Sequence, residues 1–572
     1  MPIAKLRYTV FILATVLMIS GVGLAATVQG GLGTVSVIEV DFQASDGSNI
    51  HGTLQTPLHS SGPLPGVLVI HGSLQSKEWL MAFGIELARR GFVVLTIDAN
   101  GHGNSDRGRG SGAAALDYLA TLPSVDNTRI GVVGHSMGGG IAREAISESS
   151  VVVNAFVAIG SWVSWANTTY PNNLLVAVGD FDSLSSYPSN PALLQDVFGT
   201  LDITPGTIYG SFSDGTARMI VIPRTNHLFE TIDPTIVSET VDWMRNSLKG
   251  GVEDEYWLPK GNLIYGWWLL GGLLSTGGAI LSIFPILTIL FDTTPFSVLK
   301  RDEKEGYAGA ASRRTYLVWG ATYAVLSVGS FYPLLGVGSL LQLLIPFSQY
   351  MALPIMSWIV GVSVIASLAL RVAVSRGIDV GIIRSGFRIQ KTTEITFKQY
   401  IVRTMLLSIL IISWLYGLTL LVDLNFALDF RCFLPGLNDL TISRALVFPL
   451  YAIVFIGFFM VESMWIMGIL RTHNREPWMR GMVIWTSESV FIKCIPYALL
   501  VLAELTVGFV LGQPLIPGIL GYSFLFFYAF LPWFAVSSII TVWCFRETGT
   551  YYLGALINGL LFGWILATIL PF

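Results

Sequence analysis

The pentapeptide Gly134-His-Ser-Met-Gly138 is the stretch whose residue types and spacing could do chemistry. It fits the pattern G-x-S-x-G, in which a serine occupies a strained turn between a strand and a helix. Glycines suit this turn because side chains there would clash with the neighbouring strand and helix. Ser136 would then present its hydroxyl over the positive end of the following helix. The motif therefore indicates a serine nucleophile.

The elements that must position this serine alternate along residues 34–250. Residues 34–57 alternate around a polar turn and predict a β-hairpin. Short apolar runs predict strands buried on both faces near residues 65–72, 92–98, 130–133, 151–160, 174–179 and 219–223. Helices are expected between them, near residues 76–90, 111–122 and 235–248. Alternating strands and helices predict a mostly parallel sheet covered on both faces.

Composition divides the 572 residues into unlike parts. Hydrophobic residues make up 52% and charged residues only 12%, well below the usual quarter of soluble proteins. Lys5 and Arg7 precede an apolar run from Val10 to Val28, which is either a signal anchor or a signal peptide cleaved near Ala25. The run is long for a signal peptide, so we favour the anchor. We expect an anchor over residues 1–30, a soluble domain over 31–250 and a membrane domain over 262–572.

Composition also limits the partners and cofactors. The chain has no long basic run and no nucleic-acid motif, so a nucleic-acid partner is not expected. The three cysteines, Cys432, Cys494 and Cys544, all lie outside the soluble domain and are interpreted as isolated buried thiols. No metal site and no organic cofactor is expected.

Residues 35–250 resemble the α/β-hydrolase superfamily, in its branch of small esterase-like and dienelactone-hydrolase-like serine hydrolases. The resemblance rests on His71-Gly72, on the loop 98–105, on Gly134–Gly138, and on a late Asp and His, all in the family's order. It implies a mostly parallel sheet flanked by helices. Only about thirteen residues separate the strands that end near Gly160 and begin near Leu174, so no large cap is expected.

The resemblance implies a Ser-His-acid triad in the chain order serine, acid, histidine. A serine hydroxyl needs an adjacent base, and that base needs an orienting acid. His227 is the one histidine between Ser136 and the membrane region, and it follows the last predicted strand. His473 lies in a predicted cytoplasmic loop. His227 is therefore the predicted base.

The acid is expected on a loop that leaves a strand. The family's spacing, three residues after the glycine that ends the strand, favours Asp182. Asp180 is the alternative, and Asp214 stays open as a more distant one. The oxyanion of the intermediate needs two backbone N–H donors, typically worth ~3 kcal/mol each. By resemblance these are the amides of Met137 and Ser73, while Asp98 and His102 shape the fold.

Eight further apolar segments are each long enough to cross ~30 Å of hydrocarbon. They lie near residues 263–291, 315–333, 350–370, 403–422, 446–469, 495–511, 519–543 and 551–570. Residues 334–349 are also apolar and could be re-entrant or change the count. Glu462 and Glu504 fall within predicted spans. A carboxylate in a span can serve ion transport, binding of polar head groups or a hydrogen bond between helices. We favour the hydrogen bond.

The distribution of lysine and arginine predicts the topology. Seventeen of them, including Lys493, fall in loops predicted inside, and only Arg431 and Arg444 fall in loops predicted outside. The same bias places the soluble domain on the extracytoplasmic side of the cell membrane.

The sequence therefore predicts a membrane-anchored serine hydrolase that cleaves an ester through an acyl-enzyme. Its expected partners are the lipid bilayer and a small-molecule or lipid-like ester. Three alternatives stay open: a peptidase or amidase with the same triad, an acyltransferase, and a transporter or sensor that uses the hydrolase fold for binding.

Overall fold

The structure is a computed structural model that describes residues 3–300, 312–389, 395–431, 436–471 and 478–572. Eight strands form one sheet in the order β1-β2-β4-β3-β5-β6-β7-β8. Their bounds are β1 Val35–Gln43, β2 Asn49–Pro57, β3 Leu64–Ile70, β4 Val93–Ile97, β5 Val125–His135, β6 Val153–Ile159, β7 Leu174–Ala177 and β8 Arg218–Val221. β2 pairs antiparallel with β1 and β4, and all the other pairs are parallel.

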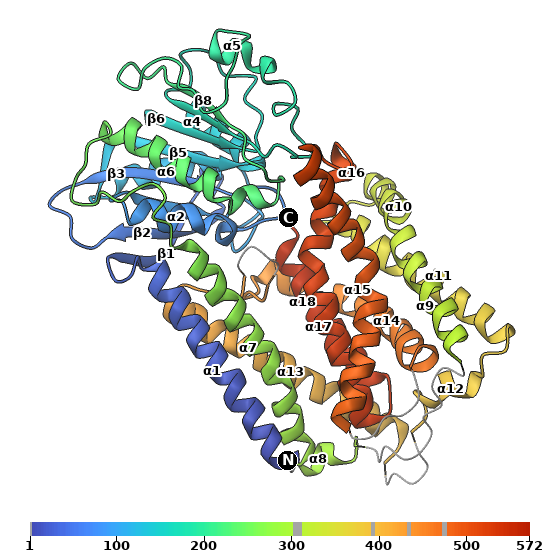
Figure 1. Cartoon of the computed structure of the whole chain (residues 1–572). Helices are drawn as coiled ribbons and strands as arrows, with labels where there is room; N and C mark the ends of the chain where they lie inside the picture. The colour runs from blue at the N-terminus through green and yellow to red at the C-terminus, as the bar shows by residue number, and fades with distance from the viewer. Residues whose placement is uncertain (1–2, 301–311, 390–394, 432–435, 472–477) are drawn as a thin grey trace.

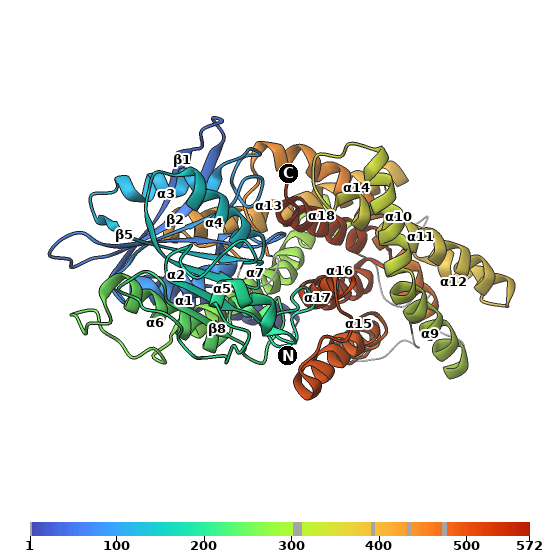
Figure 2. The ribbon, with the colours of Figure 1, turned by 90° about the horizontal axis from the view of Figure 1, so that it is seen from above.

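Helices cover both faces of this sheet (Figure 2). Helices α2 (Met81–Ala88) and α6 (Pro234–Lys249) pack on one face, and α3 (Ser111–Thr121) and α4 (Met137–Glu148) on the other. Shorter elements are η1 Lys77–Leu80, η2 Pro191–Leu194, α5 Gln195–Phe198 and η3 Phe229–Thr231. Successive residues of β3 enter opposite cores, Val67 with α2 and Leu68 with α3, because a strand alternates its faces. The expected α/β-hydrolase fold is confirmed.

Two long helices connect this domain to the rest of the molecule. Helix α1 (Ile3–Gln29) precedes the sheet domain in the chain, and helix α7 (Tyr265–Phe291) follows it. The two helices run side by side (Figure 1). Small residues form their contact: a Cβ on Gly21 would lie 2.4 Å from the backbone N of Ser275, and one on Gly271 would lie 2.7 Å from the Ala25 N. Such close approach is typical of helices that pair within a membrane.

A helical region follows α7. Its bounds are α8 Thr294–Ser297, α9 Arg313–Gly329, α10 Phe331–Leu344, α11 Ala352–Ser375, α12 Val380–Ser385, α13 Phe397–Phe426, α14 Ile442–Ser463, η4 Met464–Ile469, α15 Trp478–Leu511, α16 Ile519–Tyr522, α17 Phe524–Thr548 and α18 Tyr552–Ile569. Among the described residues, nine helices, α1 included, are long and apolar enough to cross a membrane. This identifies a membrane protein. Helix α10 continues α9 after a break at Ser330, so residues 313–344 form one candidate span.

Two charged residues lie where the sequence analysis did not expect them. Lys493 was counted in an inner loop, but α15 begins at Trp478 and contains it. Arg444 was counted in an outer loop, but it lies in the first turn of α14 and is buried. Both residues were counted in loops because hydropathy excludes a charge from a span unless its partner is known. The sides of the membrane predicted for them stay predictions. Cys494 and Cys544 are buried free thiols, as expected, and Cys432 lies outside the described residues.

The helical region holds the sheet domain through buried polar contacts. The Arg444 guanidinium donates to the carbonyls of Gly101 and Gly103 in the loop after β4, and also to those of Ala567 and Leu570 at the end of α18. The backbone N of Phe572 donates to the Gly101 carbonyl at 3.0 Å. A buried guanidinium with four carbonyl partners fixes the loop against the helices.

Candidate active site

The nucleophile motif folds as its sequence predicts. Strand β5 ends at His135, helix α4 begins at Met137, and Ser136 between them has φ +52°. A Cβ on Gly134 would lie 2.6 Å from the Gly138 carbonyl oxygen, and one on Gly138 would lie 2.2 Å from that of Ile70. Positive φ is strained for a serine, and such strain is found at functional sites. The turn therefore presents Ser136 at the carboxyl edge of the sheet.

The three predicted triad side chains lie in one hydrogen-bonded row. His227 Nε2 lies 2.9 Å from Ser136 Oγ, and His227 Nδ1 lies 2.9 Å from Asp182 Oδ2. Asp182 follows β7 and His227 follows β8, so adjacent parallel strands bring both loops to the serine. Asp182 and His227 are buried. The arrangement matches a nucleophile, a base and an orienting acid within hydrogen-bond reach.

The alternative acids lie elsewhere. Asp180 forms an ion pair with Arg224, with its Oδ2 2.8 Å from the arginine Nε. Asp214 is exposed and is bonded to Ser213. Asp182 alone of these three carboxylates contacts the His227 ring.

A second carboxyl group, which the sequence analysis missed, lies beside the triad. Glu230 Oε2 is 3.5 Å from His227 Nδ1 and 3.3 Å from His135 Nε2, and Glu230 Oε1 accepts from the Gly179 amide at 2.7 Å. Burial, with Asp182 nearby, raises the pKa of Glu230 well above its ordinary value. The raised pKa favours the protonated form of Glu230 at pH values where an ordinary glutamate is ionised. No sequence motif identifies Glu230 as a site residue. Its position three residues after His227 is compatible with both residues lying in the same turn.

His135, the residue before the nucleophile, is fully enclosed. Burial, with His227 nearby, lowers its pKa well below the ordinary value, so the ring is neutral. Its Nε2 lies 3.1 Å from the His227 carbonyl oxygen and its Nδ1 lies 3.1 Å from Gln75 Oε1. His135 thus ties the loop that carries the base to the loop that follows β3.

The predicted oxyanion donors flank the serine. Met137 is the first residue of α4, and Ser73 follows Gly72, where a Cβ would lie 3.1 Å from the Ser136 Cβ. Asp98 accepts from the backbone N of Lys77 and of Asn104. His102 Nδ1 contacts the Asn100 carbonyl. Asp98 thus connects η1 to the loop after β4, and the shaping role of Asp98 and His102 stays a prediction.

The helical region contacts both loops that carry the triad (Figure 1). On the acid's loop, the Gly518 amide donates to the Ser183 carbonyl at 2.6 Å, and the ring of Phe181 meets that of Phe509 at 5.4 Å. On the base's loop, the ring of Phe229 meets that of Tyr528 at 5.3 Å. The loop that carries the acid and the loop that carries the base therefore both pack against residues of α15 to α17 and the turn between them.

Tyr522 of α16 comes nearest to the reacting groups. Its ring centroid lies 5.9 Å from that of His227, and its hydroxyl donates to the Ser73 carbonyl at 3.3 Å. Behind it a small cavity of about 40 Å³ reaches from Ser73 to helix α17. Its lining residues are Ser73, Leu74, Gln75, Trp79, Leu228, Tyr522, Phe526, Ala529, Phe530 and Ile569.

The carboxylates predicted within spans also have partners. Glu462 pairs with Lys493 at 2.8 Å and accepts from the Tyr323 hydroxyl at 3.1 Å. Glu504 Oε2 accepts from the Leu515 amide at 2.8 Å, which holds the turn between α15 and α16. His473 lies outside the described residues.

The fold is that of the α/β hydrolases, and comparison with known proteins identifies the family. Residues 24–252 match the family described as PETase, PET hydrolase-like. Cutinase 2 of Thermobifida cellulosilytica is 32% identical over 181 residues, which are 27% of this chain and 67% of the cutinase. The chain therefore belongs to the PET hydrolase-like family through this domain.

Other relatives carry names of ester hydrolases. Bis(hydroxyethyl) terephthalate hydrolase of Streptomyces coelicolor is 37% identical over 138 residues, 23% of this chain and 44% of that protein. Lipase 1 of Moraxella sp. is 31% identical over 141 residues, 23% of this chain and 44% of the lipase. The chain spans less than half the length of most curated relatives it matches. These names describe the enzyme class that the sequence analysis expects, the carboxylic ester hydrolases.

Proposed function

We propose that this protein is a membrane-anchored serine hydrolase that cleaves a carboxylic ester on the extracytoplasmic side. The row of hydrogen bonds from Asp182 through His227 to Ser136, at 2.9 Å each, carries the proposal. The names of the relatives favour an ester over an amide. The topology rests on the excess of basic residues in the loops on the other side.

In the first half of the reaction, Ser136 Oγ attacks the ester carbonyl while His227 Nε2 takes its proton. The Asp182 carboxylate accepts the Nδ1 hydrogen and so orients the ring and stabilises its charged form. The carbonyl oxygen becomes an oxyanion, which accepts hydrogen bonds from the amides of Met137 and Ser73. His227 then gives its proton to the leaving alcohol, and an acyl group remains on Ser136.

In the second half, a water molecule attacks the acyl-enzyme. His227 takes one water proton, and the new tetrahedral intermediate uses the same two amides. Collapse breaks the bond to Ser136 Oγ, which recovers its proton from His227 and releases the carboxylic acid.

Labelling of the detergent-solubilised full chain with a fluorophosphonate probe tests the proposal. The wild type should be labelled and should hydrolyse p-nitrophenyl acetate, and Ser136→Ala should do neither. Asp180→Asn is a matched control, because Asp180 lies beside the site and is bonded to Arg224 instead. Equal labelling of wild type and Ser136→Ala would refute the proposed nucleophile.

The proposed side of the membrane has its own test. A cysteine at Ser60, in the exposed turn before β3, should react with a membrane-impermeant maleimide in intact cells. Reaction only after lysis would place the domain inside and overturn this part of the proposal.

A further inference from the structure

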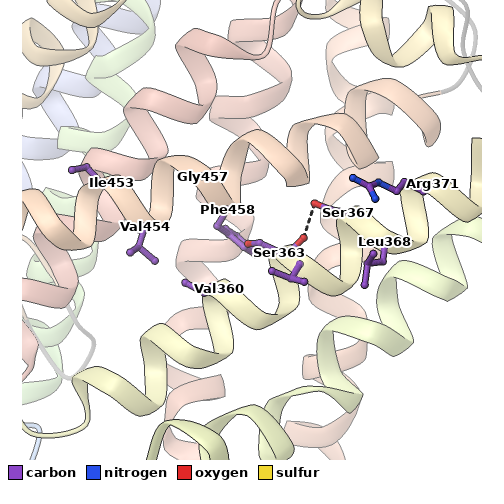
Figure 3. Close-up of a pocket in the computed structure, with 10 residues that line it drawn as sticks. Val360, Ser363, Ser367, Leu368, Arg371, Ile453, Val454, Gly457 and Phe458 are labelled. Carbon is purple, nitrogen blue, oxygen red and sulfur yellow. Dashed lines mark hydrogen bonds between the residues drawn. The ribbon is translucent and has the colours of Figure 1, made fainter. Parts of the chain in front are cut away.

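A groove lies between α11 and α14, far from the triad loops (Figure 3). Its volume of about 430 Å³ falls within the range of cavities that bind small molecules. Helix α11 lines it with Val360, Val364, Leu368 and Arg371, and helix α14 lines it with Ile453 and Gly457 among others. The groove is therefore large enough for a ligand, and its position between two candidate spans bears on which ligand that is.

The wall of the groove is apolar even where serines line it. Ser363 Oγ donates to the Ile359 carbonyl at 2.7 Å, and Ser367 Oγ donates to the Ser363 carbonyl at 2.8 Å, so both hydroxyls are bonded to their own helix (Figure 3). Val364 is 54% exposed and Ile453 is 68% exposed. Exposed apolar side chains that gather on candidate spans mark a surface in contact with lipid. The groove is therefore open to the bilayer.

Gly457 forms part of the hollow because it has no side chain. A Cβ at Gly457 would have no atom within 4 Å, whereas a Cβ at Gly361 on α11 would lie 2.6 Å from the side chain of Leu334. Gly457 borders the groove. The space beside Gly457 is therefore empty, and a larger side chain at this position would occupy part of the groove.

The groove lies in the half of the helical region that is farther from the hydrolase domain. The start of α11 is near that domain, because the Tyr350 amide donates to the carbonyl of Pro571 beside the loop after β4. The end of α11 leads to α12, on the opposite side (Figure 1). Along the helix axis Arg371 lies about 29 Å from Ala352 and about 16 Å from Val360. The groove thus extends from near the middle of a ~30 Å hydrocarbon core to its boundary.

Arg371 places a positive charge at the boundary end of the groove. Its side chain is exposed, and it makes no ion pair within the part of the chain that the structure describes. A guanidinium is always charged and binds phosphate oxygens through paired N–H donors. A phospholipid carries its phosphate at this boundary and its acyl chains inward from it. The charge of Arg371 and the apolar groove are therefore complementary to one such molecule.

We propose that the groove binds one anionic phospholipid of the leaflet opposite the hydrolase domain. Its phosphate contacts Arg371, and one acyl chain lies along Leu368, Val364 and Val360 beside Gly457. Lipid tails are as apolar as the groove, so burial of apolar surface gives no preference over the bilayer. The preference comes from the shape of the groove and from Arg371, since basic groups at the boundary attract anionic lipids. The site does not depend on the proposed hydrolase activity.

Two matched pairs of variants separate the charge from the shape. Arg371→Gln removes the charge, and Arg376→Gln is its control, because Arg376 is an exposed arginine at the end of α11 that does not line the groove. Gly457→Leu fills part of the groove. Gly417→Leu on α13 is its control, since a Cβ there also has no atom within 4 Å. Leucine favours a helix more than glycine does, so neither exchange should unfold its helix.

Native mass spectrometry of the full chain in mild detergent measures the binding of dioleoyl phosphatidylglycerol and of zwitterionic dioleoyl phosphatidylcholine. The wild type should bind the first phosphatidylglycerol more tightly than phosphatidylcholine. Arg371→Gln should weaken the binding of phosphatidylglycerol by about fivefold, and Arg376→Gln should not. Gly457→Leu should weaken the binding of both lipids, and Gly417→Leu should match the wild type.

Equal binding of phosphatidylglycerol by the wild type and by either Arg371→Gln or Gly457→Leu would overturn the site. A wild type that is dimeric in the same detergent and becomes monomeric in Gly457→Leu would also overturn it, because a second copy of the chain would then occupy the groove. If Gly457→Leu does not fold, Gly457→Ala replaces it with a smaller loss of binding expected. The measurement does not involve Ser136, so a failure of the proposed function would leave its result unchanged.

Discussion

Glu230→Gln should make the hydrolase domain more stable at neutral pH, because burial beside the triad disfavours the ionised form of the wild-type side chain. Burial, with Asp182 nearby, raises the pKa of Glu230 well above its ordinary value of 4.5. A glutamine has nearly the shape of the protonated acid and can keep the contact of Oε1 with the Gly179 amide. The substitution therefore removes a titration and little else.

The sign and size of the effect follow from proton linkage. Above about pH 4.5 the unfolded chain releases the Glu230 proton while the folded chain keeps it, so the stability of the wild type falls as pH rises. The slope is about 1.4 kcal/mol per pH unit until Glu230 also ionises in the folded state. The variant should therefore gain stability relative to the wild type above about pH 4.5, and the gain should grow until Glu230 ionises in the folded state.

The assay is the temperature at which the full chain loses half of its fluorophosphonate labelling, measured at pH 5 and pH 7. For a domain of this size each kcal/mol of gain corresponds to a rise of about 2–4 °C, and the rise should be larger at pH 7 than at pH 5. Glu144→Gln, on the exposed side of α4, should show no such pH dependence. A variant that is less stable than the wild type at pH 7 would mean that Glu230 is ionised, and would refute the reasoning.

Three further predictions concern the triad, the turn and the domain contact. Asp182→Asn should lower kcat/KM for p-nitrophenyl acetate by about 10⁴ while Asp180→Asn stays within about threefold, and comparable rates for the two would remove Asp182 as the acid. Gly138→Ala should abolish labelling, because its Cβ would lie 2.2 Å from the Ile70 oxygen, whereas Gly140→Ala, with no atom within 4 Å, should label normally. Arg444→Ala should lower the half-loss temperature, because four carbonyls lose a donor at about 1–3 kcal/mol each when they stay buried. An unchanged temperature would show that water replaces the guanidinium.

Local sequence patterns were sufficient to predict the strands of the sheet and the nucleophile. Strands buried on both faces read as continuous apolar runs, so β3 to β8 could be predicted near their true bounds. Ser136 could be predicted because its turn requires glycines at Gly134 and Gly138, and each glycine approaches backbone too closely for a Cβ. The positions of Asp182 and His227 came from a family resemblance, and the structure brings both to Ser136.

Features that depend on contacts between residues far apart in the sequence could not be predicted from local patterns. Glu230 is an ordinary acidic residue in the sequence, and only its burial, with Asp182 nearby, raises its pKa. Lys493 was assigned to a loop because its partner Glu462 lies 31 positions away on another helix. Tyr522 is 295 positions from His227, so no spacing rule connects them. In each case the tertiary contact determines the role of the residue.

The most direct test of the central claim is mass spectrometry of the fluorophosphonate-treated wild type, read on the peptide that spans residues 130–140. We predict one phosphonyl adduct per chain, on Ser136 Oγ, with its amount reduced in Asp182→Asn. An unmodified peptide, or an adduct on another serine such as Ser161, would contradict the proposed triad.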